Sequence, residues 1–147
     1  MTASNHVLTG ALLLAAVPHP AMLPVALVSH FALDALPHFD APDPDHTKKE
    51  FVYILFSDMA VAGSILLAII VWQPVNWPLL VAGGILAASP DLMWFPHWVN
   101  ELRGRPNKEL GAISKFHSAI QRYTHFRNWP IEAAWFLASG LLLLRVA

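Results

Sequence analysis

The chain of 147 residues is long enough for one domain and too short for two of average size. Hydrophobic residues make up 56% of it and charged residues only 13%, about half the charged share of an average soluble domain. This composition, with a mean hydropathy of +0.48, predicts a membrane protein. The sparse arginines argue against a nucleic-acid partner, and the absence of cysteine excludes disulfides, thiolate metal sites and a cysteine nucleophile.

Two short apolar helices are expected first, from His6 to Val17 and from Ala21 to Leu36, separated by Pro18-His19-Pro20. Both are shorter than the roughly 20 residues needed to cross a bilayer upright, so they either cross a thin region or form an embedded hairpin. The first run has no basic segment before it and no cleavage site after it. It is therefore interpreted as a retained membrane segment and not as a signal peptide.

The rest of the chain alternates apolar helices with polar connections. An amphipathic helix is expected where apolar residues recur at helical spacing in a basic segment, and Pro90 is expected to kink or end the helix that contains it. The expected elements are a polar loop over 40–50, helices over 51–72 and from Leu79 to about Pro90, an apolar segment over 92–99, the amphipathic helix over 107–125 and a last helix over 129–146. The predicted fold is a single all-α integral membrane domain over residues 1–147, a compact bundle of about five transmembrane or membrane-embedded helices plus one amphipathic interfacial helix.

The lysines and arginines predict the orientation. All of them except Arg145 occur in the segments 40–50 and 100–128, and none occurs in the turns at 18–20 and 73–78. The positive-inside rule therefore places both long loops and the N-terminus in the cytoplasm, for a multi-pass protein of the cell inner (plasma) membrane. In this topology most of the histidines and the aspartates within apolar segments fall near the cytoplasmic ends of their helices.

The candidate site begins with His30 and Asp34, which lie one helical turn apart and therefore on one face. Pro37 disfavours helix at Leu36, so His38 follows just beyond the helix end. Two imidazoles and a carboxylate are ligands that suit a divalent metal ion. The alternative is a histidine and an aspartate that only hydrogen-bond each other inside a helical bundle.

Asp58 and Asp91 also lie in apolar segments without lysine or arginine, where an unpaired carboxylate costs several kcal/mol. A cation would neutralise them, and a donor set of nitrogen and oxygen without sulfur favours Zn²⁺ or Mn²⁺ over Ca²⁺ and Mg²⁺. Asp58 has the alternative of hydrogen-bonding a neighbouring helix, Asp91 that of capping a helix, and His117 that of packing in the interior. The candidate metal ligands are His30, Asp34, His38, Asp91, Asp58, His6 and His117, and the candidate catalytic residues are Asp34, Asp91 and His117.

The motifs that carry a resemblance run from Ser29 to Asp40, over Ser89-Pro90-Asp91 and over Phe116-His117-Ser118, with His6 in the first apolar segment. Together they resemble the YdjM-like family of small bacterial inner-membrane metal-dependent hydrolases. The last of these motifs matches half of a family pattern that contains two histidines and an arginine. The resemblance implies a membrane-embedded helical fold and a metal-dependent hydrolytic activity.

Three functional hypotheses stay open at this point. The first is a metal-dependent hydrolase at the cytoplasmic membrane interface, which acts on a lipid or lipid-linked phosphoester drawn from the bilayer. The second is an ion- or proton-handling protein that uses its intramembrane carboxylates. The third is a non-catalytic structural or assembly protein, in which the polar cluster only holds the fold together.

Overall fold

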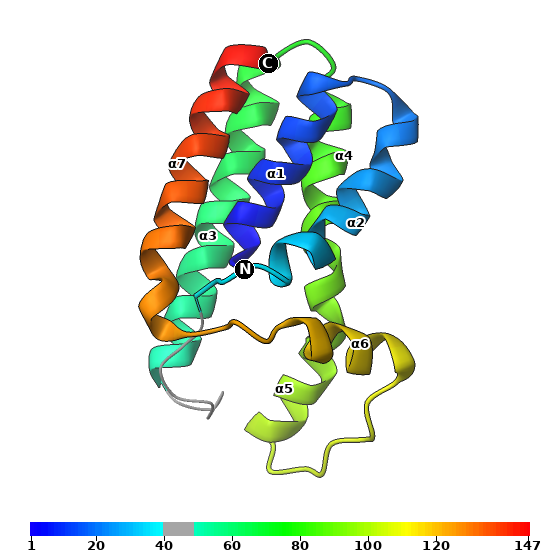
Figure 1. Cartoon of the computed structure of the whole chain (residues 1–147), viewed down its shortest axis with the longest axis vertical. Coiled ribbons are helices and arrows are strands. Elements are labelled where there is room, and N and C mark those ends of the chain that lie inside the picture. Colours follow the sequence, from blue (N-terminus) through cyan, green and yellow to red (C-terminus); the bar gives the residue numbers. More distant parts are fainter. Residues whose placement is uncertain (40–48) are drawn as a thin grey trace.

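The computed structural model describes residues 1–39 and 49–147, and within them the fold is built from helices without a β-strand (Figure 1). The all-α prediction is confirmed for this part of the chain, and most of the loop expected over 40–50 lies outside the described residues. The helices are α1 (Ala3–Ala16), η1 (Pro20–Met22), α2 (Leu23–Asp34), α3 (Lys49–Trp72), α4 (Trp77–Ala88), η2 (Ser89–Trp94), α5 (Phe95–Leu102), α6 (Ala112–Ile120), η3 (Phe126–Asn128) and α7 (Trp129–Val146).

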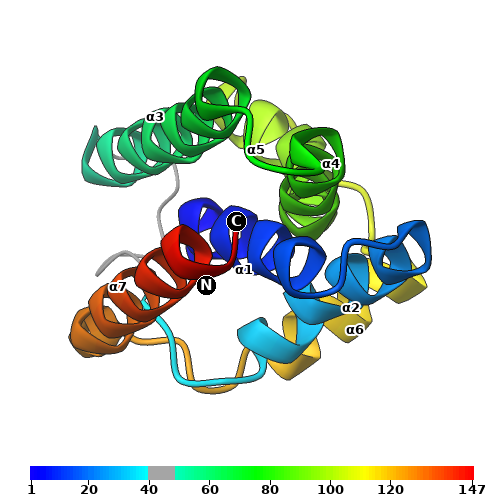
Figure 2. The same cartoon turned by 90° about the horizontal axis from the view of Figure 1, so that it is seen from above.

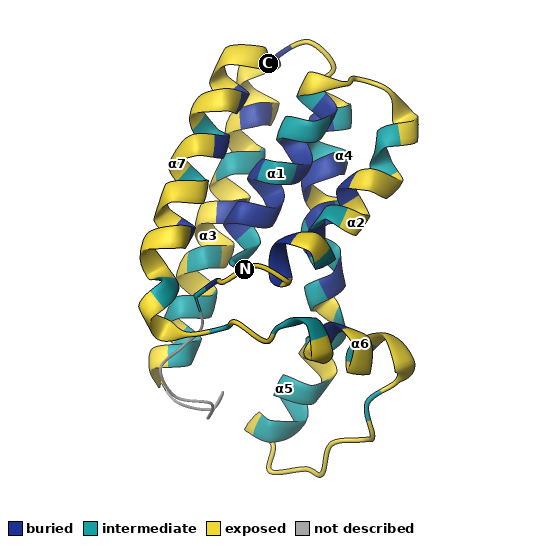
Figure 3. Cartoon of the chain, in the orientation of Figure 1, coloured by how far each residue is buried: buried dark blue, intermediate teal, exposed yellow. Residues whose placement is uncertain are grey.

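Three helical stretches are long and apolar enough to cross a membrane, namely Lys49–Trp72, Trp77–Leu102 and Phe126–Val146. The expectation of about five such segments is not confirmed, because Ala3–Ala16 and Pro20–Asp34 are shorter apolar helices. The 14 residues of α1 rise only about 21 Å, less than the hydrocarbon core of roughly 30 Å. The outer faces of α3 and α7 are apolar and exposed, as at Leu67 and Leu137, which suits contact with lipid (Figure 3).

Helix α1 lies at the centre of the bundle and packs against α2, α3, α4 and α7 (Figure 2). Its closest approach is to α4, at Gly10 and Gly83. A Cβ atom built on Gly10 would lie 2.2 Å from the carbonyl oxygen of Gly83, so neither position accepts a side chain without separating the helices. Small residues at a helix crossing allow backbones to approach closely inside a membrane, where apolar burial gives little driving force. This contact determines where α1 lies in the bundle.

The two ends of the bundle differ in polarity. The α1–α2 turn, the α3–α4 turn and the C-terminus lie at one end, and α5, α6 and the starts of α3 and α7 lie at the other (Figure 1). The segments on either side of α6 contain Arg103, Arg105 and Arg127, so these basic residues belong to the second end. Helix α1 begins part-way along the bundle (Figure 1), and the end of α2 beside it contacts both η2 and α6.

The boundaries correct several sequence predictions. Helix α1 begins at Ala3 and not at His6, and α2 is preceded by η1. The amphipathic helix expected over 107–125 covers only Ala112–Ile120, because Gly111 is extended and Gln121 leaves helical geometry. Apolar periodicity does not detect such ends, whereas glycine disfavours helix continuation. The predicted change at Pro90 is confirmed, since the chain turns from α-helix to 3-10 helix over Ser89–Trp94.

Candidate metal centre

Three separate elements bring four metal-type ligands together. His30 and Asp34 come from the last turns of α2, Asp91 from η2 and His117 from α6, and one ligand atom of each lies within 4.8 Å of the others. His30 Nε2 lies 3.1 Å from His117 Nε2, 3.3 Å from Asp34 Oδ2 and 3.5 Å from Asp91 Oδ1. The predicted convergence of His30, Asp34 and Asp91 is therefore present, and His117 completes the group.

Three of the four side chains are shielded from solvent. His30 and His117 are fully buried and Asp34 is 1% exposed, whereas the side chain of Asp91 is 37% exposed. The group is therefore closed by α1, α2 and α6 and accessible on the side of Asp91. A partly exposed ligand beside three buried ones is the arrangement of a site that a small molecule can reach from one direction.

The kink at Pro90 prepares His30 for metal binding. Proline has no backbone N–H, so carbonyl groups in the preceding turn of α4 lose a helical partner. The Ser89 hydroxyl donates to the carbonyl of Leu86 at 2.9 Å, and His30 Nδ1–H donates to the carbonyl of Ala87 at 2.8 Å. The hydrogen on Nδ1 leaves Nε2 of neutral His30 with its lone pair directed at the cluster, which is how second-shell acceptors orient metal-binding histidines.

His117 has the opposite tautomer. Indole N–H groups only donate, so the 3.2 Å contact from Trp94 Nε1 places an acceptor at His117 Nδ1 and the proton on Nε2. That Nε2–H donates to Asp34 Oδ2 at 2.6 Å, and His30 Nε2 lies 3.1 Å from the same nitrogen. A single proton thus lies among the nitrogen and oxygen atoms that would surround a metal ion.

The second oxygen of Asp34 is also occupied. Its Oδ1 accepts from the amino group of Met1 and contacts His6 Nε2 at 3.1 Å. The His6 ring stacks on the His30 ring with centroids 4.0 Å apart, so His6 supports the group from the side of α1 without belonging to the four converging ligands. Gln121 donates to Asp34 Oδ2 at 3.0 Å from the end of α6.

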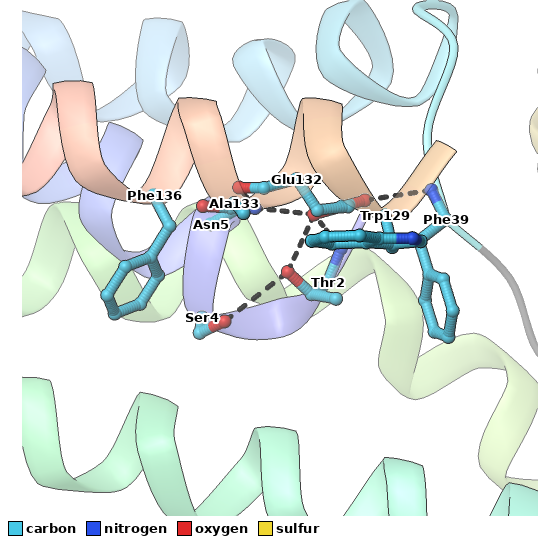
Figure 4. A pocket seen from close by; sticks show the side chains of 8 residues that line it. All are labelled: Thr2, Ser4, Asn5, Phe39, Trp129, Glu132, Ala133 and Phe136. Atoms are coloured by element: carbon cyan, nitrogen blue, oxygen red, sulfur yellow. Dashed lines mark hydrogen bonds between the residues drawn. The ribbon is translucent and has the colours of Figure 1, made fainter. Parts of the chain in front are cut away.

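Asp58, a predicted ligand, lies elsewhere. Its carboxylate accepts from the backbone N–H groups of Ala3 and Ser4, at 2.6 and 3.1 Å, and so caps the start of α1. Glu132 of α7 serves the same end of the helix (Figure 4): its carboxylate accepts from the Thr2 hydroxyl at 2.9 Å and from the side-chain amide of Asn5. We call Asp58 and Glu132 the capping pair, and Asp58 corresponds to the alternative stated for it, a hydrogen bond to a neighbouring helix.

His38, another predicted ligand, joins two chain segments. Its Nδ1–H donates to the carbonyl of Leu36 at 2.8 Å, and its own carbonyl accepts from the N–H of His125 at 3.0 Å. Burial, together with the nearby positive N-terminus, lowers the pKa of His38 and favours the neutral ring. The structure places His38 between the end of α2 and the connection to α7, outside the four-ligand group.

Sequence reasoning missed three residues that shape these clusters. Gln121 follows His117 by one helical turn, so helical spacing was a usable signal for it. Glu132 is a carboxylate in the first turn of an apolar helix, and its place in such a helix was a usable signal. Trp94 gave no signal, because its N–H is aimed at His117 only through the turn of η2.

A tetrahedral ion with ligands at ~2.0–2.2 Å would hold its donor atoms about 3.3–3.6 Å from one another. The contacts of His30 at 3.1, 3.3 and 3.5 Å suit this spacing, whereas the 2.6 Å contact between His117 and Asp34 is a hydrogen bond that has to lengthen. Comparisons with protein-family models, with curated proteins and with solved structures give no match to this chain.

Proposed function

We propose that the chain is a membrane metalloenzyme of the YdjM-like family, which hydrolyses an ester or phosphoester bond of a lipid at the cytoplasmic membrane interface. The observation that supports this most directly is the meeting of His30, Asp34, Asp91 and His117 from three elements of an apolar bundle. Of the residues that suggested the family, His30, Asp34, Asp91 and His117 form this group, and His6 contacts it through Asp34.

The donor set supports a divalent ion. Nitrogen and carboxylate oxygen without sulfur suit Zn²⁺ or Mn²⁺, and the two carboxylates balance the charge of the ion in an apolar surrounding. A bound ion of this kind supplies a water of lowered pKa and polarises the oxygen of an ester or phosphoryl group.

The protein side chains divide the remaining tasks. Asp34 and His30 are buried and held by further hydrogen bonds, so they would bind the metal ion and fix its position. Asp91 lies on the accessible side, where its carboxylate can accept a proton from an attacking water. Burial of the other ligands excludes bulk water from the far side of the site, which strengthens electrostatic interactions within it.

The arrangement of the bundle ends supports the interfacial location. The four ligands lie toward the end of the bundle that carries α5, α6 and the arginine-containing segments (Figure 1). The positive-inside rule assigns that end to the cytoplasm of a cell whose inner membrane holds the protein. A lipid headgroup in that leaflet would lie at the depth of Asp91.

The test combines metal analysis with hydrolysis by purified protein in detergent. We expect about one Zn²⁺ or Mn²⁺ per chain, and cleavage of p-nitrophenyl butyrate or bis-p-nitrophenyl phosphate that a chelator abolishes and the metal restores. Asp91→Asn should remove the cleavage, while the control Glu109→Gln, at an exposed carboxylate, should retain it. Protein without bound metal, or cleavage insensitive to chelation, would contradict the proposal and favour a purely structural cluster.

A further inference from the structure

An apolar groove runs between α2, η2 and α6, beside the metal-ligand group. It is open on one side and has a volume of about 570 Å³, within the roughly 300–1,000 Å³ typical of small-molecule sites. Among the described residues, no charged side chain lines it, and the hydroxyl of Ser89 in its wall already donates to Leu86. The apolar walls are formed by Leu27, Phe31, Pro90, Met93, Ile113 and Phe116.

The groove shares a wall with the ligand group. Phe31, Pro90 and Phe116 line it, and each is the sequence neighbour of a ligand, His30, Asp91 or His117. The Phe31 ring lies 5.2 Å from the ring of His30, 5.5 Å from that of His117 and 5.7 Å from that of Phe116. The Phe31 ring would therefore lie between a molecule in the groove and the two histidine ligands.

The groove is also continuous with the apolar outer surface of the bundle. Leu27 is 37% exposed and the next residue of α2, Val28, is 61% exposed. On α6, Ile113 and Phe116 are 67% and 55% exposed. An extended apolar molecule could enter from the hydrocarbon phase without crossing water.

We propose that this groove binds one acyl chain of a membrane phospholipid, with the ester end of the chain beside Asp91 and the methyl end toward Leu27 and Ile113. The inference rests on the proposed hydrolase function, because the groove would then present a scissile ester to the ligand group. Cleavage adds water across the ester: the hydroxyl goes to the acyl or phosphoryl group and the proton to the leaving oxygen. Leu27 lies four residues, or about 6 Å along the helix, from Phe31, which gives the chain its direction.

The experiment is photolabelling in nanodiscs of phosphatidylglycerol that contain a phosphatidylcholine probe. The probe carries a diazirine either near the carbonyl or near the methyl end of one acyl chain, and labelled residues are mapped by mass spectrometry. The carbonyl-end probe should label Phe31, Pro90 and Phe116, and the methyl-end probe should label Leu27 and Ile113. Both patterns should exceed the labelling of the exposed apolar faces of α3 and α7.

A matched pair of variants tests occupancy. Ile113→Trp fills the groove and should lower its labelling several-fold without changing the bound metal, whereas Leu137→Trp on α7, at a residue of similar exposure, should leave groove labelling unchanged. Equal labelling of all lipid-facing helices, or labelling that ignores Ile113→Trp, overturns the inference while the metal analysis still supports the hydrolase. Groove labelling in a protein that binds no metal overturns the proposed function and the ester placement with it.

Discussion

Two groups of acidic side chains lie on opposite sides of the start of α1, and they differ in their donors. The capping pair, Asp58 and Glu132, accepts from backbone N–H groups and from the side chains of Thr2 and Asn5. Asp34 accepts from the amino group of Met1 at Oδ1 and from His117 and Gln121 at Oδ2, and its Oδ1 also contacts His6 of α1. All three carboxylates sit in apolar helices, so their sequence surroundings are alike.

The two groups differ in whether a metal ion can replace the proton of the donor. A peptide N–H cannot give up its proton at neutral pH, so the capping pair is committed to satisfying the first turn of α1. An imidazole nitrogen can carry a proton or present a lone pair, and a metal ion can replace the proton. A buried carboxylate surrounded by imidazoles is therefore a candidate binding site, and one surrounded by peptide groups is a helix cap.

The largest effect is expected from Gly10→Leu, which would break both groups at once. The new side chain would collide with the backbone of Gly83 and push α1 away from α4, at a cost of at least about 3 kcal/mol. Thermal unfolding in detergent should show a large loss of stability together with loss of bound metal. Gly140→Leu, at a position with open space around it, is the control and should retain both. Equal stability of the two variants would contradict the described crossing.

Asp34→Asn should remove the metal site and leave the capping pair in place. Breaking a buried charge network costs roughly 3–5 kcal/mol, and the neutral amide cannot balance the charge of an ion. Wild type should gain about 2.7 kcal/mol when free metal exceeds Kd a hundredfold, and the variant should gain nothing. The measurement is the melting temperature with and without chelator. A wild type that ignores the chelator, beside a variant that is more stable, would leave only the structural interpretation.

Glu132→Gln is the converse experiment, because it changes the capping pair and leaves the metal ligands in place. The amide keeps one acceptor oxygen but loses the negative charge near the start of α1, so we expect a loss of about 0.5–2 kcal/mol with the metal response intact. Melting curves with and without chelator give both quantities, with Glu109→Gln as the exposed control. If Glu132→Gln also removed the metal response, the two groups would have to be regarded as one site.

The smallest and sharpest effect concerns Trp94→Phe. The indole N–H favours the His117 tautomer that keeps a proton on Nε2, so it competes with a metal ion for that nitrogen. Loss of a hydrogen bond worth about 0.5–1.5 kcal/mol should raise metal affinity roughly two- to tenfold. Titration of the protein with Zn²⁺, after a chelator has removed bound metal, measures this affinity. A fall in affinity would mean that Trp94 supports the metal-bound state, contrary to the donor arrangement.

Much of the fold could be predicted from sequence. Composition and apolar run lengths indicated an all-helical membrane protein, and Pro90 marked the place where α4 changes geometry, because hydrophobicity and the missing N–H of proline act locally. The number of crossing helices was not predictable in the same way. Whether a short apolar helix such as α1 spans or only packs inside depends on its neighbours, and the α1–α4 contact at Gly10 leaves its start part-way along the bundle.

The candidate site was likewise predictable in part. The one-turn spacing of His30 and Asp34 was enough to predict that they share a face, because helical geometry relates residues on one element. Only the tertiary structure decided that His117 and Asp91 join them while Asp58 caps α1 and His38 holds a loop. Residue types and spacing along a helix do not specify its rotation or its partners, and the role of a buried carboxylate is decided by which donors the packing brings to it.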